Sequence, residues 1–237
     1  MSKITGDQQV QSDVLEGLAT AVNHRRWFVE LAIPYLGDHP IEVGSGLGDY
    51  ALEWAPHFDR FTATEADPDR LVELKERLHG HPSIDVRELL LPTDEVADYS
   101  AAVSYNVLEH IEDHVGALRS MARLVRPGGR IILIVPAFMF AMSPVDIATG
   151  HVRRYTKKTM RAAMEEAGLQ IEKLHYANAL GLIGYYMATS VFKLTPKEGP
   201  MVKFYDRLVL PVTKGAESLV RPPFGQSVFV VARVPEK

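Results

Sequence analysis

Apolar and polar positions divide the chain into two kinds of segment. Short, nearly continuous apolar runs alternate with longer segments in which apolar residues recur at helical spacing, as at Leu71, Leu74 and Leu78. The short runs are typical of strands buried on both faces, and the longer segments are typical of amphipathic helices. The alternation predicts an α/β fold with a parallel sheet covered on both faces. After a first strand that ends near Val43, we expect strands at residues 60–65, 84–88, 101–105, 131–135, 170–176 and 227–234.

A glycine-rich turn follows the first strand. Gly44, Gly46 and Gly48 stand at alternate positions, with Ser45 between the first two. Glycines allow sharp bends and a close approach of the backbone to a ligand, and a helix start beyond the turn offers free N–H groups. The dinucleotide pattern needs a glycine where this chain has Asp49, and the Gly-Lys-Ser/Thr of a phosphate loop is absent. The turn therefore predicts a nucleotide-like ligand of another kind.

Two acidic residues end the first two strands. Glu42 would repel a pyrophosphate, but it can anchor a cation such as the ammonium group of an amino acid. Glu65 lies about 20 residues beyond the glycines, where a carboxylate of a doubly wound sheet accepts hydrogen bonds from two ribose hydroxyls. Asp67 is the alternative ribose ligand. Because Pro68 follows it, Asp67 is better interpreted as the cap of the next helix.

An acid followed by alternate glycines resembles the first motif of the class I S-adenosylmethionine (SAM)-dependent methyltransferases. Later matches follow in the family's order: Asn-Val-Leu-Glu-His-Ile from Asn106, Arg-Pro-Gly-Gly from Arg126, and Gly-His-Val-Arg-Arg-Tyr at residues 150–155, which is typical of one bacterial group. The resemblance covers residues 27–155 closely. One departure is that Glu88 and Leu89 stand where the family usually has an aspartate near the adenine.

The resemblance implies a Rossmann-like seven-stranded sheet with an antiparallel last strand, in a single domain over residues 1–237, and SAM as cofactor. In that fold the last two strands form a hairpin, but here residues 177–225 separate them. We expect this segment to be a mostly helical lid over the carboxyl ends of the strands. The expected cofactor contacts are Glu42, Gly44, Ser45, Gly46, Gly48, Glu65, Ala66, Glu88, Leu89, Asn106 and Val107.

An N-terminal cap of helices is expected over residues 1–38. Apolar residues within 13–36 approximate a helical stripe, which would pack beside the glycine turn. Arg25, Arg26 and Trp27 lie in its middle. One arginine, which we assign as Arg26, could reach the cofactor carboxylate, and Trp27 could cover the ligand. The alternative is a solvated arginine pair and a tryptophan that only packs.

Methyl transfer from SAM mainly requires alignment of acceptor, methyl and sulfur, and a hydroxyl acceptor also requires a general base. His110 follows the fourth strand and His151 follows the fifth, so both are candidate bases, and Asp146 could orient His151. The alternative for each histidine is a polar residue that is hydrogen-bonded at a helix cap. The spacing of the acids and histidines does not suggest a metal site, and we expect none.

Composition narrows the choice of acceptor. With 237 residues, 46% of them hydrophobic, the chain suffices for one core. A net charge of −4 and a pI near 6.1 offer no general attraction to nucleic acid, which favours a small-molecule acceptor methylated at oxygen or nitrogen. The pocket is expected to be partly apolar and to suit an aromatic, heteroaromatic or natural-product-like molecule. The alternatives are a catalytically silent SAM-binding module and, disfavoured by Glu42 and Asp49, a nicotinamide-dependent oxidoreductase.

Location follows from what the sequence lacks. The absence of cysteine excludes disulfides, thiolate metal sites and a cysteine nucleophile. The first residues have no apolar core of the signal-peptide kind, and the longest uncharged run, residues 176–192, is too short and too polar to span a bilayer. We therefore expect a cytoplasmic protein without stable membrane insertion. The sequence sets no oligomeric state.

Overall fold

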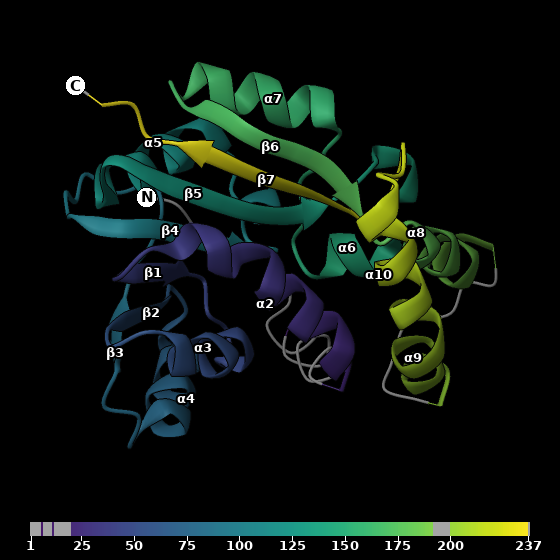
Figure 1. The fold of residues 1–237 in the computed structure, drawn as a ribbon, viewed down its shortest axis with the longest axis horizontal. Helices are drawn as coiled ribbons and strands as arrows, with labels where there is room; N and C mark the ends of the chain where they lie inside the picture. Colours follow the sequence, from purple (N-terminus) through teal and green to yellow (C-terminus); the bar gives the residue numbers. More distant parts are fainter. Residues whose placement is uncertain (1–5, 7–10, 12–19, 192–199, 237) are drawn as a thin grey trace.

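A seven-stranded sheet forms the centre of the computed structural model, which describes residues 6, 11, 20–191 and 200–236 (Figure 1). The strand order is β3-β2-β1-β4-β5-β7-β6, and only β7 runs antiparallel to its neighbours. The predicted Rossmann-like sheet with an antiparallel last strand is confirmed. The strands are β1 (Pro40–Val43), β2 (Phe61–Glu65), β3 (Ile84–Glu88), β4 (Tyr99–Tyr105), β5 (Val125–Pro136), β6 (Gln170–Ala177) and β7 (Ser227–Arg233).

The strand boundaries expected from the sequence agree closely for β2, β3, β6 and β7 and differ for two central strands. β4 begins at Tyr99 and β5 at Val125, both earlier than expected, because these two residues pair before the Pro-Gly-Gly turn. The register between the strands then shifts between Tyr99 and Ala101. Pairing on both sides of a turn is a tertiary feature, which an apolar run alone does not reveal.

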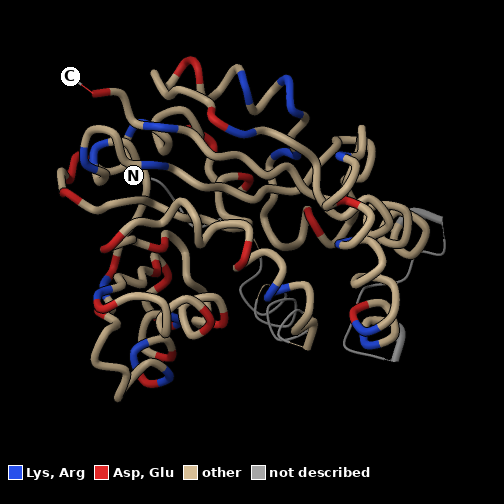
Figure 2. Tube along the Cα trace, in the orientation of Figure 1, with Lys and Arg blue, Asp and Glu red and all other residues tan. Residues whose placement is uncertain are grey.

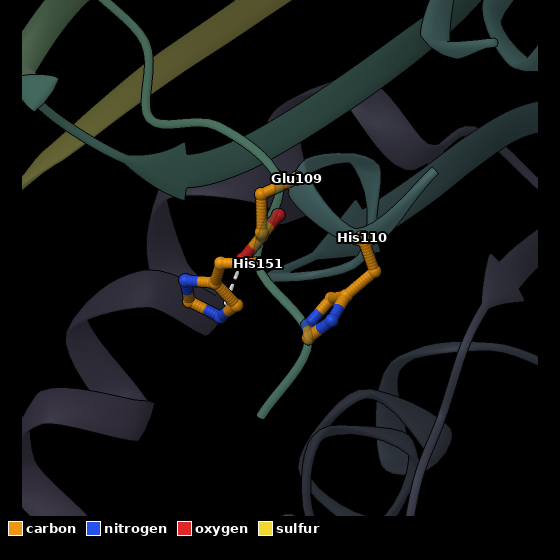
Figure 3. A group of neighbouring side chains, drawn as sticks. All are labelled: Glu109, His110 and His151. Atoms are coloured by element: carbon orange, nitrogen blue, oxygen red, sulfur yellow. Dashed lines mark ion pairs between the residues drawn. The ribbon is translucent and has the colours of Figure 1, made fainter. Parts of the chain in front are cut away.

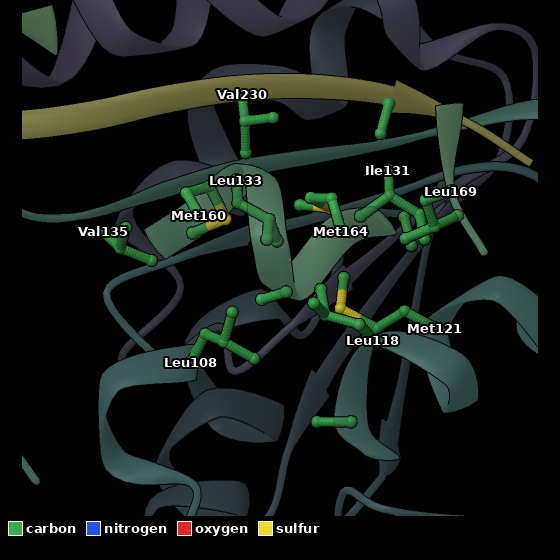
Figure 4. Packing of buried hydrophobic residues seen from close by; sticks show 14 of the residues in the cluster. Leu108, Leu118, Met121, Ile131, Leu133, Val135, Met160, Met164, Leu169 and Val230 are labelled. Carbon is green, nitrogen blue, oxygen red and sulfur yellow. The ribbon is translucent and has the colours of Figure 1, made fainter. Parts of the chain in front are cut away.

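Two hydrophobic layers cover the sheet. On one face, α5 (His114–Leu124) and α7 (Lys157–Glu166) bury Leu118, Met121 and Met160 against β5 and β7 (Figure 4). On the other, α2 (Val22–Leu36), α3 (Asp49–Trp54) and α4 (Pro68–Leu78) bury a second cluster that includes Phe28 and Trp54. Both layers are mainly apolar, as the largely aliphatic central strands require.

Further helices lie between β6 and β7, where the sequence predicts a helical segment. They are α8 (Ala179–Tyr186), α9 (Pro200–Phe204) and α10 (Leu210–Leu219), with π-helical turns at Met187–Val191 and Tyr205–Val209. They stand at the end of the sheet where β6 ends and β7 begins (Figure 1). A short helix, α6 (Pro144–Ala148), follows β5. Residues 192–199 of the expected lid, and residues 1–5, 7–10 and 12–19 of the expected N-terminal cap, lie outside the described residues.

Acidic and basic positions are interspersed over the described chain, and α8 carries no charged residue (Figure 2). Although α8 is apolar, it is short. Within residues 20–191 and 200–236, no helix has both the length and the apolar character needed to cross a membrane.

Two carboxylates from the inserted segment cap the N-termini of α2 and α8. Asp206 accepts hydrogen bonds from the backbone N–H groups of Asn23 (3.1 Å) and His24 (2.9 Å), at the N-terminus of α2. The residue before α2 supplies no capping side chain of its own. Glu217 likewise accepts from the backbone N–H of Ala179 (2.8 Å) at the start of α8. Because an anion at a helix N-terminus satisfies free N–H groups and complements the helix dipole, the Asp206 contact joins α2 to the inserted helices and the Glu217 contact joins α10 to α8.

Replacing Asp206 should therefore loosen this junction. We expect Asp206→Ala to lower the free energy of unfolding by about 1–2 kcal/mol, because two backbone donors lose a charged acceptor. Urea unfolding followed by circular dichroism measures this change. Asp59→Ala, at an exposed position, is the matched control and should change it little. Equal stability of both variants would show that Asp206 does not cap α2 in solution.

Candidate functional site

The glycine turn between β1 and α3 is fixed to β2 by Ser45. The Ser45 backbone N–H donates to the Thr64 carbonyl oxygen (2.7 Å), and the Ser45 hydroxyl accepts from the Thr64 N–H (3.1 Å). The same hydroxyl donates to Glu42 Oε2 (2.7 Å). Ser45 thus joins the turn, the end of β1 and the end of β2, and it places the carboxylates of both strands at one edge of the sheet.

Two of the glycines are also required by packing. Gly44 has φ +76°, and a Cβ atom there would come within 2.5 Å of Val107 Cγ2. Gly48 has φ +83°, and a Cβ atom there would lie 2.8 Å from Leu74 Cδ1. The left-handed backbone and these contacts both exclude a side chain. Val107, an expected cofactor contact, thereby lies directly against the start of the turn.

Glu42 is a buried acid without a cationic partner. Its side chain is buried, the residue being 2% exposed, and burial raises its pKa to about 8. Among residues 20–191 and 200–236, no basic side chain forms an ion pair with it, and the nearby Glu65 disfavours its charge further. A buried carboxylate of this kind gains most from a ligand that brings a positive charge. The position suits an ammonium group.

Glu65 is held by backbone donors. Its Oε2 accepts from the Gly46 N–H, and its Oε1 accepts from the N–H groups of Ala66 and Asp67, all at 2.9 Å. A carboxylate has about four acceptor positions, so roughly one remains for a ligand hydroxyl. Binding two ribose hydroxyls at once would require one backbone N–H to give way. The Arg70 guanidinium, 3.8 Å away, adds positive charge beside this carboxylate.

The residues near Glu65 differ in their hydrogen bonds and in their exposure. Asp67 Oδ1 accepts from the N–H groups of Asp69 and Arg70, both at 3.0 Å, so its interpretation as a helix cap is confirmed. At the end of β3, Leu89 is buried and donates its N–H to the Glu65 carbonyl oxygen (3.2 Å), whereas Glu88 is exposed.

The arginines of α2 point in different directions. The Arg26 side chain is 63% exposed, whereas that of Arg25 is 14% exposed and its Nε lies 3.3 Å from Glu53 Oε1. Trp27 is buried, and its ring packs against Phe28 at 5.5 Å between centroids. Of the two arginines, Arg25 is the one that faces the protein.

A second group of polar residues surrounds His151. Its Nδ1 lies 2.8 Å from Asp146 Oδ1. Asp146 is buried and also receives hydrogen bonds from Arg154 Nη2 (2.7 Å), the Ser143 hydroxyl (2.7 Å) and the Tyr185 hydroxyl (3.0 Å). Although burial acts in the opposite direction, His151, Arg154 and Ser143 hold the pKa of Asp146 well below its ordinary value. Asp146 is therefore ionised and orients His151. Sequence reasoning did not single out Arg154 or Tyr185 for this role.

His110 packs against His151, with their rings nearly perpendicular and 4.6 Å apart between centroids. Burial, followed by the charge of His151, lowers the pKa of His110 to about 4. Hydrogen bonds to the backbone of Gly150 and Thr149 act in the other direction without reversing this shift. His110 is therefore neutral near pH 7, and Asp146 lies beside His151 rather than beside His110.

Glu109 completes this group. It is 0% exposed, and neither carboxylate oxygen has a hydrogen-bond partner from another residue in the described part of the chain. Its Oε1 lies 3.8 Å from His151 Nε2 (Figure 3), and burial raises its pKa to about 7. One donor atom from each of Glu109, His110 and His151 lies within 4.8 Å of the other two. The one signal in the sequence was its position directly before His110.

Three non-glycine residues with left-handed backbones mark this edge of the sheet. They are Asn106 (φ +54°), Phe138 (φ +64°) and Asn178 (φ +63°), which follow β4, β5 and β6. Such residues are uncommon and gather at functional sites. Asn106, an expected cofactor contact, is exposed here.

Gln11 of the N-terminal segment links the two polar groups. Its side chain donates to the Thr149 carbonyl oxygen (2.6 Å) and accepts from Arg70 Nη1 (2.8 Å). Arg70 belongs to the glycine-turn side and Thr149 to the segment that carries His151. Gln11 therefore bridges α4, which carries Arg70, and the segment that carries His151.

The comparisons with known proteins follow this geometry. The sequence model of a family described as "Methyltransferase domain" matches residues 41–131. A ubiquinone/menaquinone biosynthesis C-methyltransferase of Rubrivivax gelatinosus is 27% identical over 126 residues, or 52% of this chain and 50% of the relative. A ubiquinone biosynthesis O-methyltransferase of Xanthomonas oryzae is 27% identical over 164 residues, or 61% of this chain and 68% of the relative. The chain thus matches between half and about two thirds of these relatives' length.

Solved structures share the fold. A Haloferax volcanii methyltransferase in complex with a methyltransferase activator matches with a TM-score of 0.64 at 13% identity, over 99% of this chain and 100% of that one. A geranyl diphosphate methyltransferase in complex with GPP and sinefungin matches with a TM-score of 0.60 at 11% identity, over 87% of this chain and 76% of that one.

The raised pKa of Glu42 predicts a pH dependence of stability. Between about pH 4.5 and pH 8 the folded chain keeps a proton at Glu42 that the unfolded chain releases, so this group lowers stability as the pH rises. Glu42→Gln should remove that loss and unfold at increasingly higher urea than the wild type as the pH is raised from 5 to 8.5. Glu88→Gln, at an exposed strand end, is the control. Parallel pH profiles of wild type and Glu42→Gln would contradict the burial of an uncompensated acid.

Proposed function

The chain belongs to the class I SAM-dependent methyltransferases, and we propose that it transfers the SAM methyl group to an oxygen or nitrogen atom of a small organic acceptor. One observation carries this proposal. The buried carboxylates of Glu42 and Glu65 flank the glycine turn, and Glu65 accepts directly from the Gly46 N–H. A pair of acids is suited to an ammonium group and ribose hydroxyls, and it is unsuited to a pyrophosphate.

The residues fit SAM in a consistent arrangement. Glu42 would bind the ammonium group, Glu65 a ribose hydroxyl, and the backbone around Leu89 the adenine, with Asn106 and Val107 as further contacts. For the cofactor carboxylate, the inward orientation of Arg25 favours it over the exposed Arg26. When bound, SAM supplies a methyl group already activated on a sulfonium. The chain's own task is to align the acceptor and exclude water.

His151 is the favoured proton acceptor for a hydroxyl substrate. Because ionised Asp146 lies at Nδ1, that nitrogen keeps its hydrogen and Nε2 is left to accept a proton. Asp146 also stabilises the imidazolium that results. His110 is the alternative, but its lowered pKa makes it a poorer base. The inserted helices take part, because the Tyr185 hydroxyl of α8 donates to Asp146.

We propose that the inserted helices form a lid and that the acceptor is partly apolar. Phe140 is an exposed aromatic ring between Phe138, 5.3 Å away, and Tyr186 of α8, 5.7 Å away. Leu180 and Ile183 of α8 are exposed as well. The relatives in ubiquinone biosynthesis and the geranyl diphosphate methyltransferase support an aromatic or prenylated acceptor.

Cofactor binding tests the first step. Titration calorimetry should show micromolar binding of SAM and of its demethylated product, and no binding of NAD. Tight NAD binding without heat from SAM would overturn the proposed function.

The same calorimetry should distinguish the proposed ribose ligand, Glu65, from the helix cap, Asp67. Glu65→Ala is expected to weaken SAM binding by about 2 kcal/mol, or roughly 30-fold, because a charged acceptor for the ribose is lost and Gly46 is released. Asp67→Ala should mainly cost about 1 kcal/mol of folding stability as a lost helix cap. If Asp67→Ala abolished binding while Glu65→Ala did not, the ribose ligand would be misassigned.

Measurements of kcat test which histidine acts as the general base. With a hydroxyl acceptor, His151→Ala is expected to lower kcat by about 10²-fold with little change in SAM affinity, because removal of a general base acts on the transition state. His110→Ala should have the smaller effect. Near-normal kcat in both variants would show that neither histidine is a general base and that alignment of the acceptor with the methyl group accounts for catalysis.

A further inference from the structure

The carboxylate of Glu109 is fully buried, which is energetically unfavourable for a charged group. Buried carboxylates in proteins are hydrogen-bonded, paired with a cation or bound to a metal, because burial without a partner is costly. In the described part of the chain, neither oxygen of Glu109 has a hydrogen-bond partner from another residue. The side chain is instead directed at the imidazoles of His151 and His110 (Figure 3).

Each imidazole has a second polar contact away from Glu109. His151 Nδ1 lies 2.8 Å from Asp146, whose other oxygen accepts hydrogen bonds from Ser143 and Tyr185. His110 forms hydrogen bonds with the backbone of Thr149 and Gly150. A metal-binding histidine is oriented in the same manner, with one ring nitrogen held by a carboxylate or carbonyl and the other on the metal.

We propose that Glu109, His110 and His151 bind a divalent first-row transition-metal ion. Two imidazoles and one carboxylate are ligands that suit Zn²⁺, Fe²⁺ or Co²⁺, and coordination bonds of about 2.0–2.2 Å bring such ligands within about 3–3.5 Å of each other. His151 Nε2 and Glu109 Oε1 are already 3.8 Å apart. The donor atoms of all three residues lie within 4.8 Å of one another, so the side chains must move closer together to bind an ion.

The backbone around these ligands is fixed in place. The Val152 N–H donates to the Glu109 carbonyl oxygen (3.0 Å), which joins the loop after β4 to the segment after α6. The His151 N–H donates to the Asp146 carbonyl oxygen (2.8 Å). The three ligands come from two segments far apart in the sequence, which is why their spacing gave no reason to expect a metal.

The role of the ion rests on the proposed function. Three protein ligands leave coordination positions open, and an acceptor oxygen bound there would be polarised and lose its proton more readily. His151 would then act as a ligand, and the acceptor's hydroxyl proton would pass to solvent water. The oxygen would form the new bond to the methyl carbon while the C–S bond of SAM breaks, leaving its electron pair on sulfur. Without an ion, His151 remains the base. Methyl-transfer activity that falls on chelation and returns with added metal would indicate that His151 acts as a ligand. Activity that is unaffected by chelation would indicate that His151 acts as the base.

Co²⁺ binding tests the site directly, in the absence of SAM and acceptor. Chelator-treated protein titrated with CoCl₂ should bind one ion per chain and develop visible ligand-field absorption bands. Glu109→Gln should weaken binding by roughly 100-fold or more, and His151→Ala should remove the bands. Glu112→Gln and His57→Ala, both at exposed positions, are the matched controls and should bind as the wild type does.

Absence of stoichiometric binding in the wild type would overturn the proposal, as would unchanged binding in both Glu109→Gln and His151→Ala. Circular dichroism of each variant checks that a loss of binding is not caused by a loss of folding. His151→Asn is a second, more conservative replacement, because asparagine is closer to histidine in size and polarity than alanine is. SAM calorimetry on the same preparations keeps the two claims apart. SAM binding without Co²⁺ binding refutes the metal site alone, and the reverse result refutes the cofactor assignment alone.

Discussion

The burial of carboxylates at the carboxyl edge of the sheet is the constraint on which this site depends. Glu42, Glu65, Glu109 and Asp146 are all withdrawn from solvent there, and each must be compensated or stay protonated. Backbone N–H groups compensate Glu65, and Arg154, Ser143 and Tyr185 compensate Asp146. Glu42 receives only the Ser45 hydroxyl, and Glu109 has no hydrogen-bond partner from another described residue, so burial raises the pKa of both acids. These two acids therefore indicate where ligands with positive charge belong.

Much of this arrangement is local in sequence and could be predicted. Apolar runs located all seven strands, and the proline after Asp67 correctly identified a helix cap. The glycine turn was recognisable because glycines at Gly44 and Gly48 are forced by a left-handed backbone and by contacts with Val107 and Leu74. In each case the signal lies in a short segment, although the packing partners of the glycines come from elsewhere in the chain.

The remaining features depend on residues that only the fold brings together. Sequence spacing gave no way to see that Glu109 faces His151, or that Tyr185 of α8 reaches Asp146. Nor could it show that the Arg25 side chain is turned inward while that of Arg26 is exposed, because packing of α2 on the sheet sets which face of the helix is covered. Asp206 at the start of α2 is a further contact of this kind.

Methyl transfer itself is the central claim, and it separates an enzyme from a silent SAM-binding module. The most direct measurement incubates the protein with methyl-labelled SAM and a metabolite extract, and identifies labelled products by mass spectrometry. We predict that the label appears in a small, partly apolar molecule at an oxygen or nitrogen atom, and that it is lost in Glu65→Ala. SAM binding without any labelled product, or label confined to protein or nucleic acid, would contradict this account.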